Sequence, residues 1–221
     1  MPLTRRAIVT VAVAGAVVST PSFAGAQPAE SPVRIGLILP LTGPFASSGR
    51  QMLAGAKLYT RQNGDMVAGR KIELIVRNDT GNADSGKRIS QELVINDKVS
   101  VLAGFGLTPI ALATAPIANE AKIPMVLMMA AGAIITEKSP YIVRASFSLP
   151  QSVAPIANWA VENGIKSVVT LVSDYAPAHD VELYFKTALR GGWWEGDRII
   201  AGATGQSRFR TFPAACRRRQ T

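Results

Sequence analysis

Short apolar runs alternate with amphipathic segments along most of the chain, and this alternation limits the possible folds more than any other feature of the sequence. The apolar runs are continuous, which is typical of parallel strands that are covered on both faces. They occupy residues 33–39, 71–78, 99–103, 124–128 and 167–172. Segments with helical periodicity lie between them, at residues 48–62, 84–96, 108–121, 150–163 and 178–189. The pattern predicts an α/β fold with Rossmann-like parallel sheets.

The expected helices begin at residues that favour helix N-termini. Ser48 and Asp84 are good capping residues, Thr108 is followed by a proline, and Pro150 suits a first helical turn. After residue 144 the alternation restarts with a new helix and strand, which predicts a crossover near residues 145–150. We therefore expect a first lobe at residues 30–145 and the start of an incomplete second lobe at residues 146–192.

The first 26 residues have the pattern of a cleavable export signal. Arg5 and Arg6 precede an apolar run at residues 7–18, and small residues at 22–26 provide a cleavage pattern. The run is shorter than the roughly 20 residues that a spanning helix needs. The arginines match a twin-arginine signal only in part, so both export routes stay open. Since the single cysteine, Cys216, lies far from this region, we expect a soluble periplasmic protein without a lipid anchor, a disulfide or a cysteine metal cluster.

The formal net charge of +9 does not indicate a nucleic-acid partner. Two of the arginines lie in the expected signal and five lie in the last fourteen residues. Residues 27–200 contain 17 basic and 15 acidic side chains, which leaves a net charge of +2. No basic stripe interleaved with aromatic residues occurs in this part of the chain, so we expect no binding of nucleic acid.

Two loops that follow predicted strands carry candidate ligand-binding residues. Phe45 and Ser47 follow the first strand, and Gly106, Leu107 and Thr108 follow the third. Each loop leads into a helix N-terminus, whose N–H groups and positive dipole end suit a small anion such as a carboxylate. The glycine permits close approach of the backbone. A dinucleotide site is not expected, because the third glycine of its fingerprint is absent.

Several short motifs, in this order and spacing, resemble one family. They are Leu-Thr-Gly-Pro-Phe-Ala at 41–46, Asn-Asp-Thr at 78–80, Ala-Gly-Phe-Gly at 103–106, Ala-Pro-Ile-Ala at 115–118, Lys-Ile-Pro-Met-Val at 122–126, Ser-Pro-Tyr-Ile-Val-Arg at 139–144 and Ser-Asp-Tyr-Ala-Pro-Ala-His-Asp at 173–180. Residues 33–191 thereby resemble the periplasmic substrate-binding proteins of ABC transporters, in the branched-chain amino-acid binding family. The resemblance implies a periplasmic binding protein of type I, whose two lobes close on a small ligand at the carboxyl ends of the strands.

The same resemblance implies a partner, a ligand class and further site residues. The partner is a membrane ABC permease, and the ligand is a branched-chain amino acid or a similar carboxylate or amide, with no cofactor. A third loop contributes Ala130, Ala131 and Gly132, where the family usually has hydroxyl side chains, so backbone groups would do the binding here. Tyr175 resembles an aromatic lid over the ligand, with a core tyrosine as the alternative. Aromatic acids and urea-like compounds use similar lobes, and we expect Asp79 and Asp84 to be caps or turn residues.

The residues give little support to an enzyme. His179 is the only histidine, and Ser173 and Asp174 are adjacent on one loop, which does not give the geometry of a catalytic triad. No Gly-x-Ser-x-Gly elbow surrounds any serine. We therefore expect no catalytic residue and no metal site. A secreted α/β hydrolase and a ligand-sensing module of a regulator are the alternatives.

The regular pattern stops at residue 193, and the composition of residues 193–221 is typical of disorder. If the reading frame is shifted by one base, the codons of Trp193 and Trp194 are read as glycine codons. With permitted codons, residues 202–216 become Val-Pro-Leu-Ala-Asn-Pro-Asp-Phe-Ala-Pro-Phe-Leu-Gln-Arg, which resembles the family at this point. We expect a single-base shift near Gly191 or Gly192, an out-of-frame tail and a truncated copy, with a functional and a non-functional product both left open. A genuine basic tail is the alternative. Residues 146–192 alone are too few to bury a stable core.

Overall fold

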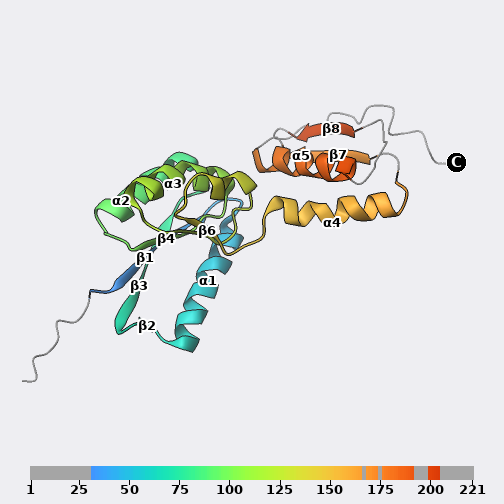
Figure 1. Ribbon diagram of the computed structural model, residues 1–221. Coiled ribbons are helices and arrows are strands. Elements are labelled where there is room, and N and C mark those ends of the chain that lie inside the picture. The colour runs from blue at the N-terminus through green and yellow to red at the C-terminus, as the bar shows by residue number, and fades with distance from the viewer. Residues whose placement is uncertain (1–30, 166–167, 174–175, 192–198, 205–221) are drawn as a thin grey trace, which may run out of the picture. The chain divides into compact units, whose positions relative to one another are not determined.

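The computed structural model describes residues 31–165, 168–173, 176–191 and 199–204 (Figure 1). The expected export signal, Tyr175 and most of the expected out-of-frame tail lie outside the described residues. Residues 31–145 form β1 Val33–Leu39, α1 Ala46–Asn63, β2 Met66–Val67, β3 Arg70–Asn78, α2 Ala83–Ile95, β4 Val101–Gly104, α3 Thr108–Ala121, β5 Met125–Leu127, the 3-10 helix η1 Ala133–Glu137 and β6 Ile142–Arg144. Residues 146–204 form α4 Leu149–Glu162, β7 Val168–Ser173, α5 Ala176–Gly191 and β8 Ile199–Thr204.

A six-stranded sheet with the order β2-β3-β1-β4-β5-β6 organises residues 31–145. Every neighbouring pair is parallel except β2 and β3, which form an antiparallel hairpin. The strand order reverses between β1 and β4, which are neighbours in the centre of the sheet. Ligands of open α/β sheets bind outside the carboxyl ends of the strands at such a reversal. The predicted α/β class is confirmed, and the reversal indicates where a site should lie.

Side chains of β1 divide the core between the two faces of the sheet. Ile38 belongs to the larger buried cluster, together with residues of α2 and α3, whereas Leu37 and Leu39 belong to a second cluster with Met52 and Leu53 of α1. Helices α2 and α3 lie on one side of the sheet, and α1 lies on the other (Figure 1). This double burial explains why the apolar runs are continuous rather than alternating.

Two of the expected helix caps are wrong. Helix α1 begins at Ala46, because the turn at Gly43 brings the Ala46 N–H to within 3.2 Å of the Gly43 carbonyl oxygen, and Ser48 therefore lies inside the first turn. Helix α2 is capped by Asn82, whose Oδ1 accepts a hydrogen bond from the Ser85 N–H, and not by Asp84. The carboxylate of Asp84 still lies in the first turn, where its negative charge interacts favourably with the positive end of the helix dipole.

The described part of residues 146–204 contains fewer helices and strands than residues 31–145. Strands β7 and β8 form a parallel two-stranded sheet. A cluster of buried apolar side chains comes from α4 and α5, at Ala157, Ala160 and Leu189. Strand β8 contradicts the expected disorder of the tail at residues 199–204, where Ile-Ile-Ala provides an apolar run that suits a strand. Within the described residues, no helix is long and apolar enough to cross a membrane.

Candidate functional site

The loops after β1, β4 and β5 lie at the carboxyl ends of neighbouring strands, and backbone hydrogen bonds join them. The Phe105 N–H donates to the Ile38 carbonyl oxygen over 2.9 Å. The N–H groups of Met128 and Ala130 donate to the carbonyl oxygens of Gly104 and Phe105, each over 2.8 Å. The structure therefore brings together the second and third predicted ligand loops beside the strand reversal.

Two glycines make this close packing possible. Gly104 has φ +111°, and a Cβ at this position would lie 2.3 Å from the Ile38 carbonyl oxygen. A Cβ on Gly106 would lie 2.7 Å from Cγ of Pro40. Gly106 therefore packs closely against the loop after β1, and a close approach of its backbone to a ligand stays a prediction.

Thr108 and Gly132, both predicted site residues, are in contact. Thr108 is buried at the start of α3, and its Oγ1 accepts a hydrogen bond from the Gly132 N–H over 3.2 Å. A Cβ on Gly132 would lie 2.6 Å from Cγ2 of Thr108, so the glycine is needed where the resemblance leads one to expect a hydroxyl residue. The Thr108 oxygen is used as an acceptor, which leaves the hydroxyl proton as a donor.

The first predicted loop is more exposed. Phe45 is 41% exposed, and Ser47 is an exposed residue of the first turn of α1. A Cβ on Gly81 would lie 3.9 Å from Cδ2 of Phe45 and 3.8 Å from Cδ1 of Leu107, so both predicted residues lie beside this glycine. Ser47 accepts a long hydrogen bond of 3.5 Å from Gln51 of its own helix. The loop thus offers an accessible aromatic ring next to Leu107.

Asn78, at the end of β3, was missed by the sequence interpretation. Its Oδ1 accepts from the N–H groups of Leu41 and Thr80, over 2.9 and 3.0 Å, and its Nδ2 donates to Oγ1 of Thr42 over 3.0 Å. One amide side chain therefore fixes the loops that follow β1 and β3. Its place at the carboxyl end of a strand, within the Asn-Asp-Thr motif at 78–80, was the signal in the sequence.

Asp79 is a turn residue, as predicted. The side chain is fully buried, and Oδ1 accepts a hydrogen bond of 2.8 Å from the Gly81 N–H. Among the described residues, Oδ2 has no hydrogen-bond partner. Burial raises the pKa of this carboxyl above its ordinary value, and the bond from Gly81 opposes the shift only in part.

Arg144, at the end of β6, was also missed as a site residue. Its Nη1 donates to the carbonyl oxygen of Ala130, and its Nη2 donates to that of Gly132 over 2.6 Å. Nη1 also lies 3.5 Å from the Phe147 carbonyl oxygen. Burial lowers the pKa of the guanidinium, but an arginine keeps its proton in proteins. The third ligand loop is therefore held by a permanent positive charge.

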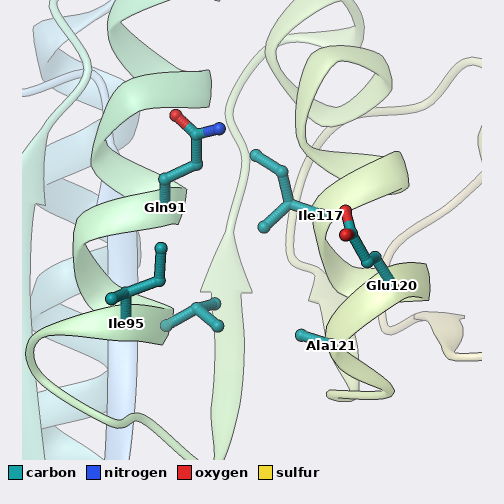
Figure 2. A pocket seen from close by; sticks show the side chains of 6 residues that line it. Gln91, Ile95, Ile117, Glu120 and Ala121 are labelled. Atoms are coloured by element: carbon teal, nitrogen blue, oxygen red, sulfur yellow. The ribbon is translucent and has the colours of Figure 1, made fainter.

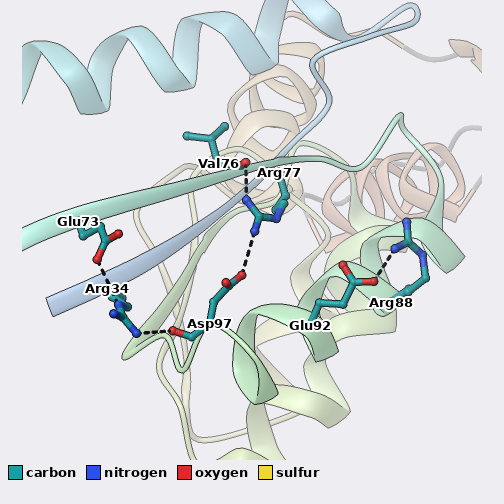
Figure 3. A network of polar contacts seen from close by, with 7 residues as sticks. All are labelled: Arg34, Glu73, Val76, Arg77, Arg88, Glu92 and Asp97. Carbon is teal, nitrogen blue, oxygen red and sulfur yellow. Dashed lines mark hydrogen bonds and ion pairs between the residues drawn. The ribbon is translucent and has the colours of Figure 1, made fainter. Parts of the chain in front are cut away.

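Three other arginines of residues 31–145 have acidic partners (Figure 3). Arg34 pairs with Glu73 at 3.1 Å, Arg77 with Asp97 at 3.0 Å and Arg88 with Glu92 at 2.6 Å. Within the part of the chain that the structure describes, Arg144 has no carboxylate at ion-pair distance. The positive charge beside the third loop is consequently not neutralised by a described side chain.

A groove between α2 and α3 lies elsewhere on the lobe (Figure 2). It has a volume of about 350 Å³ and is lined by Gln91, Val94, Ile95, Ile117, Glu120 and Ala121. These residues belong to the C-terminal halves of both helices, whereas Thr108 opens α3. The groove is therefore separate from the three loops.

The backbone of the loops supplies hydrogen-bond donors. No partner for the Ala131 N–H occurs among the described residues, and the first N–H groups of α3 are left without intrahelical partners, as at any helix start. Together with the Thr108 hydroxyl and the charge of Arg144, they form a site that suits an anion. No group of three or more His, Cys, Asp or Glu side chains in the described ranges could hold a metal ion.

Comparison with known proteins identifies related chains. The model of the periplasmic binding protein family matches residues 32–207. The Leu/Ile/Val-binding protein homolog 6 of Brucella abortus (strain 2308) is 43% identical over 158 residues, which are 71% of this chain and 40% of the relative.

Solved structures give a similar result. A solute-binding protein of an ABC transporter from Rhodopseudomonas palustris BisB5, in complex with 3,4-dihydroxybenzoic acid, is 51% identical with a TM-score of 0.73, over 77% of this chain and 47% of that one. Another from R. palustris, in complex with 4-hydroxybenzoate, is 37% identical with a TM-score of 0.73, over 79% and 47%. The chain therefore spans less than half the length of these relatives.

Proposed function

The chain belongs to the periplasmic binding protein family, and from this premise we propose that it captures a small aromatic carboxylate as the solute-binding component of an ABC importer. The choice of ligand rests on the hydrogen bonds that the carbonyl oxygens of the loop after β5 already accept. The carbonyl oxygens of Ala130 and Gly132 accept from Arg144, and that of Ala131 accepts from the Leu149 N–H over 3.0 Å. The loop thus offers donors and positive charge.

A carboxylate fits this arrangement. The N-terminus of α3, the Ala131 N–H and the Thr108 hydroxyl can each donate a hydrogen bond to an anionic oxygen. The charge of Arg144, which no carboxylate of the described residues neutralises, favours a ligand with a net negative charge. Phe45, exposed beside Leu107, offers an apolar surface to an aromatic ring.

An amino acid fits the described residues less well. Its ammonium group needs acceptors, and each of the three consecutive carbonyl oxygens of the third loop already uses at least one of its two lone pairs for a hydrogen bond. The guanidinium of Arg144 would also repel the ammonium group. Two solved relatives contain hydroxybenzoates, which carry no ammonium group, and this supports the aromatic carboxylate. A branched-chain amino acid remains the alternative, supported by the names of the curated relatives.

Calorimetric titration of the 221-residue protein tests the ligand class. We expect 3,4-dihydroxybenzoate to bind with a Kd of about 0.1–1 mM, because the chain spans less than half the length of its relatives. The uncharged 3,4-dihydroxybenzamide and zwitterionic leucine should bind at least about tenfold more weakly. Stronger binding of leucine than of the benzoate would contradict the proposal.

We place the protein in the periplasm, delivered there by the expected export signal, with a membrane permease as its partner. Binding without chemical turnover is the expected endpoint, and Tyr175 is the proposed aromatic lid. A panel of aryl esters and amides should therefore remain unhydrolysed. Turnover that is lost on substitution of Ser173 would instead favour the hydrolase alternative.

We further propose that the reading frame shifts near Gly191 or Gly192. The support is the family-like peptide that the alternative frame gives for residues 202–216. Sequencing the gene across the codons for residues 188–206 and onward tests this proposal. One extra or missing base followed by a long family-like extension is expected, and the absence of such sequence in the other frames would refute it.

A further inference from the structure

We propose that Arg144 is a positioning residue, which couples the ligand-binding loop at residues 128–132 to the interlobe crossover at residues 145–149. The inference rests on the proposed function for the meaning of the loop, but its structural part can be tested without a ligand. This coupling would transmit ligand binding on the first lobe to the segment at which the chain leaves that lobe.

Three successive carbonyl oxygens of the loop accept hydrogen bonds from one short segment. Arg144 donates to the oxygens of Ala130 and Gly132, and the Leu149 N–H donates to that of Ala131. Both donors come from residues 144–149, at the two ends of the crossover. The loop therefore cannot change its carbonyl directions without breaking a bond to the crossover.

The loop is equally fixed on its other side. The Ala130 N–H donates to the Phe105 carbonyl oxygen, and the Gly132 N–H donates to Oγ1 of Thr108. A ligand that bonds to Thr108 or to the Ala131 N–H would pull directly on the peptide groups that Arg144 holds. Movement would then pass to Phe147, whose carbonyl oxygen lies 3.5 Å from Nη1 of Arg144.

The geometry requires an arginine rather than any cation. The planar guanidinium presents five N–H donors in a fixed fork, so one side chain reaches the oxygens of Ala130 and Gly132 at once. A lysine ammonium has a different shape and a flexible stem, and it should hold only one of these oxygens well.

Hydrogen exchange provides a direct test on wild-type protein, Arg144→Gln and Arg144→Lys. The reporters are the amides of Gly132 and Leu149, and the Leu102 amide, which donates to the Pro124 carbonyl oxygen over 2.9 Å, monitors the sheet. Without ligand, we expect Arg144→Gln to speed exchange at Gly132 and Leu149 by about tenfold, with Leu102 unchanged. Arg144→Lys should be intermediate, and the control Arg88→Gln, which removes an exposed ion pair on α2, should match wild type.

Addition of about 10 mM 3,4-dihydroxybenzoate tests the coupling itself. In wild type, the ligand should slow exchange at both Gly132 and Leu149, whereas in Arg144→Gln it should slow exchange at Gly132 alone. A merely structural role of Arg144 would leave both amides sensitive to the ligand.

Three outcomes would overturn the inference. They are unchanged exchange at Gly132 and Leu149 in Arg144→Gln, complete restoration by Arg144→Lys, which would mean that charge alone matters, and retained ligand protection of Leu149 in Arg144→Gln. If Arg144→Gln also speeds exchange at Leu102, this variant is destabilised globally. Exchange at Gly132 and Leu149 in Arg144→Lys then decides whether the inference holds. If wild type shows no ligand effect, the proposed ligand fails, whereas faster ligand-free exchange at both amides still supports the tie to the crossover.

Discussion

Residues 31–145 and residues 146–204 share the same alternation of strands and helices, but they bury very different cores. In the first region, helices cover both faces of a six-stranded sheet (Figure 1), and a buried cluster lies on each side of it. In the described part of the second region, a two-stranded sheet accompanies a cluster with three buried apolar residues. Local pattern specifies the elements in both regions, whereas stability depends on how many neighbours each element has.

A buried carboxylate in each region shows the same contrast in electrostatic terms. Asp79 has a raised pKa, because its burial is compensated by one backbone N–H only. Glu182 has a lowered pKa, because Oε1 accepts hydrogen bonds from the Thr170 hydroxyl at 2.6 Å and from the Lys186 ammonium group at 2.9 Å. Burial alone disfavours the charged form, and partners reverse the effect.

The largest expected effect compares two fully buried leucines, Leu102 in β4 and Leu189 in α5. Leu102→Ala should lower the free energy of unfolding of the main transition by about 2–5 kcal/mol, because it leaves a cavity in the larger core. Leu189→Ala should leave this transition almost unchanged and increase hydrogen exchange only in α4 and α5. Urea unfolding with exchange measurements checks both, and equal losses in the main transition would refute the contrast between the regions.

A second prediction compares two glycines of the first region. Gly132→Ala should lower the free energy of unfolding by about 1–3 kcal/mol, because the new Cβ would collide with Thr108. The variant should weaken benzoate binding as well. Gly55→Ala is the control, because no atom lies within 4 Å of the new Cβ in α1, and it should stabilise by about 0.5–1 kcal/mol. Thermal unfolding and calorimetry measure both, and unchanged binding by Gly132→Ala would place the ligand elsewhere.

Helix caps provide a smaller comparison between the regions. Asn82→Ala removes the bond to the Ser85 N–H and should cost about 1 kcal/mol in the main urea transition. In the second region, Gln151→Ala removes a bond of 2.7 Å from the Ser148 N–H to Oε1 of Gln151 at the start of α4. This variant should loosen α4 without changing the main transition. A loss of similar size in the main transition would show that the two regions unfold together.

The smallest expected effect is an opposite pH dependence of the two carboxylates. The folded state holds the Asp79 proton more tightly than the unfolded state, so stability falls as the pH rises above the ordinary pKa of 3.8 through the raised one. Asp79→Asn should remove this loss and gain relative stability at pH 7. For Glu182, the stabilisation is complete above the ordinary pKa of 4.5 and is lost as the pH falls through the lowered value, so Glu182→Gln should lose stability at pH 7. Unfolding midpoints of both variants and of wild type between pH 3 and 7 test these opposite changes in stability. A change in the same direction in both variants would contradict the prediction.

Much of the fold follows from local pattern. The predicted bounds of β1 and α3 agree with the structure, and the other predicted strands and helices differ by one or two residues at their ends, whereas β6 and β8 were not predicted as strands. The start of α1 was wrong because the backbone turn at Gly43, and not a serine side chain, begins the helix. The short hairpin strand β2 and the 3-10 helix η1 were not predicted, because two to five residues carry too little periodicity.

The site could be predicted only in part. Thr108 and Gly132 were both predicted as site residues and are in contact in the structure, while their binding of a ligand stays a prediction. Asn78 and Arg144 were missed because their roles depend on contacts with other loops, which spacing along one strand does not reveal. The role of Tyr175 stays a prediction, because it lies outside the described residues.

The most direct test of the ligand site is a chemical-shift titration of ¹⁵N-labelled protein with 3,4-dihydroxybenzoate. We predict the largest shifts at the amides of Leu107, Thr108 and Ala131, since these groups surround the proposed carboxylate position. Amides that line the groove between α2 and α3, such as Val94 and Ile117, should not shift. Shifts confined to that groove, or no shift up to about 10 mM ligand, would contradict the account.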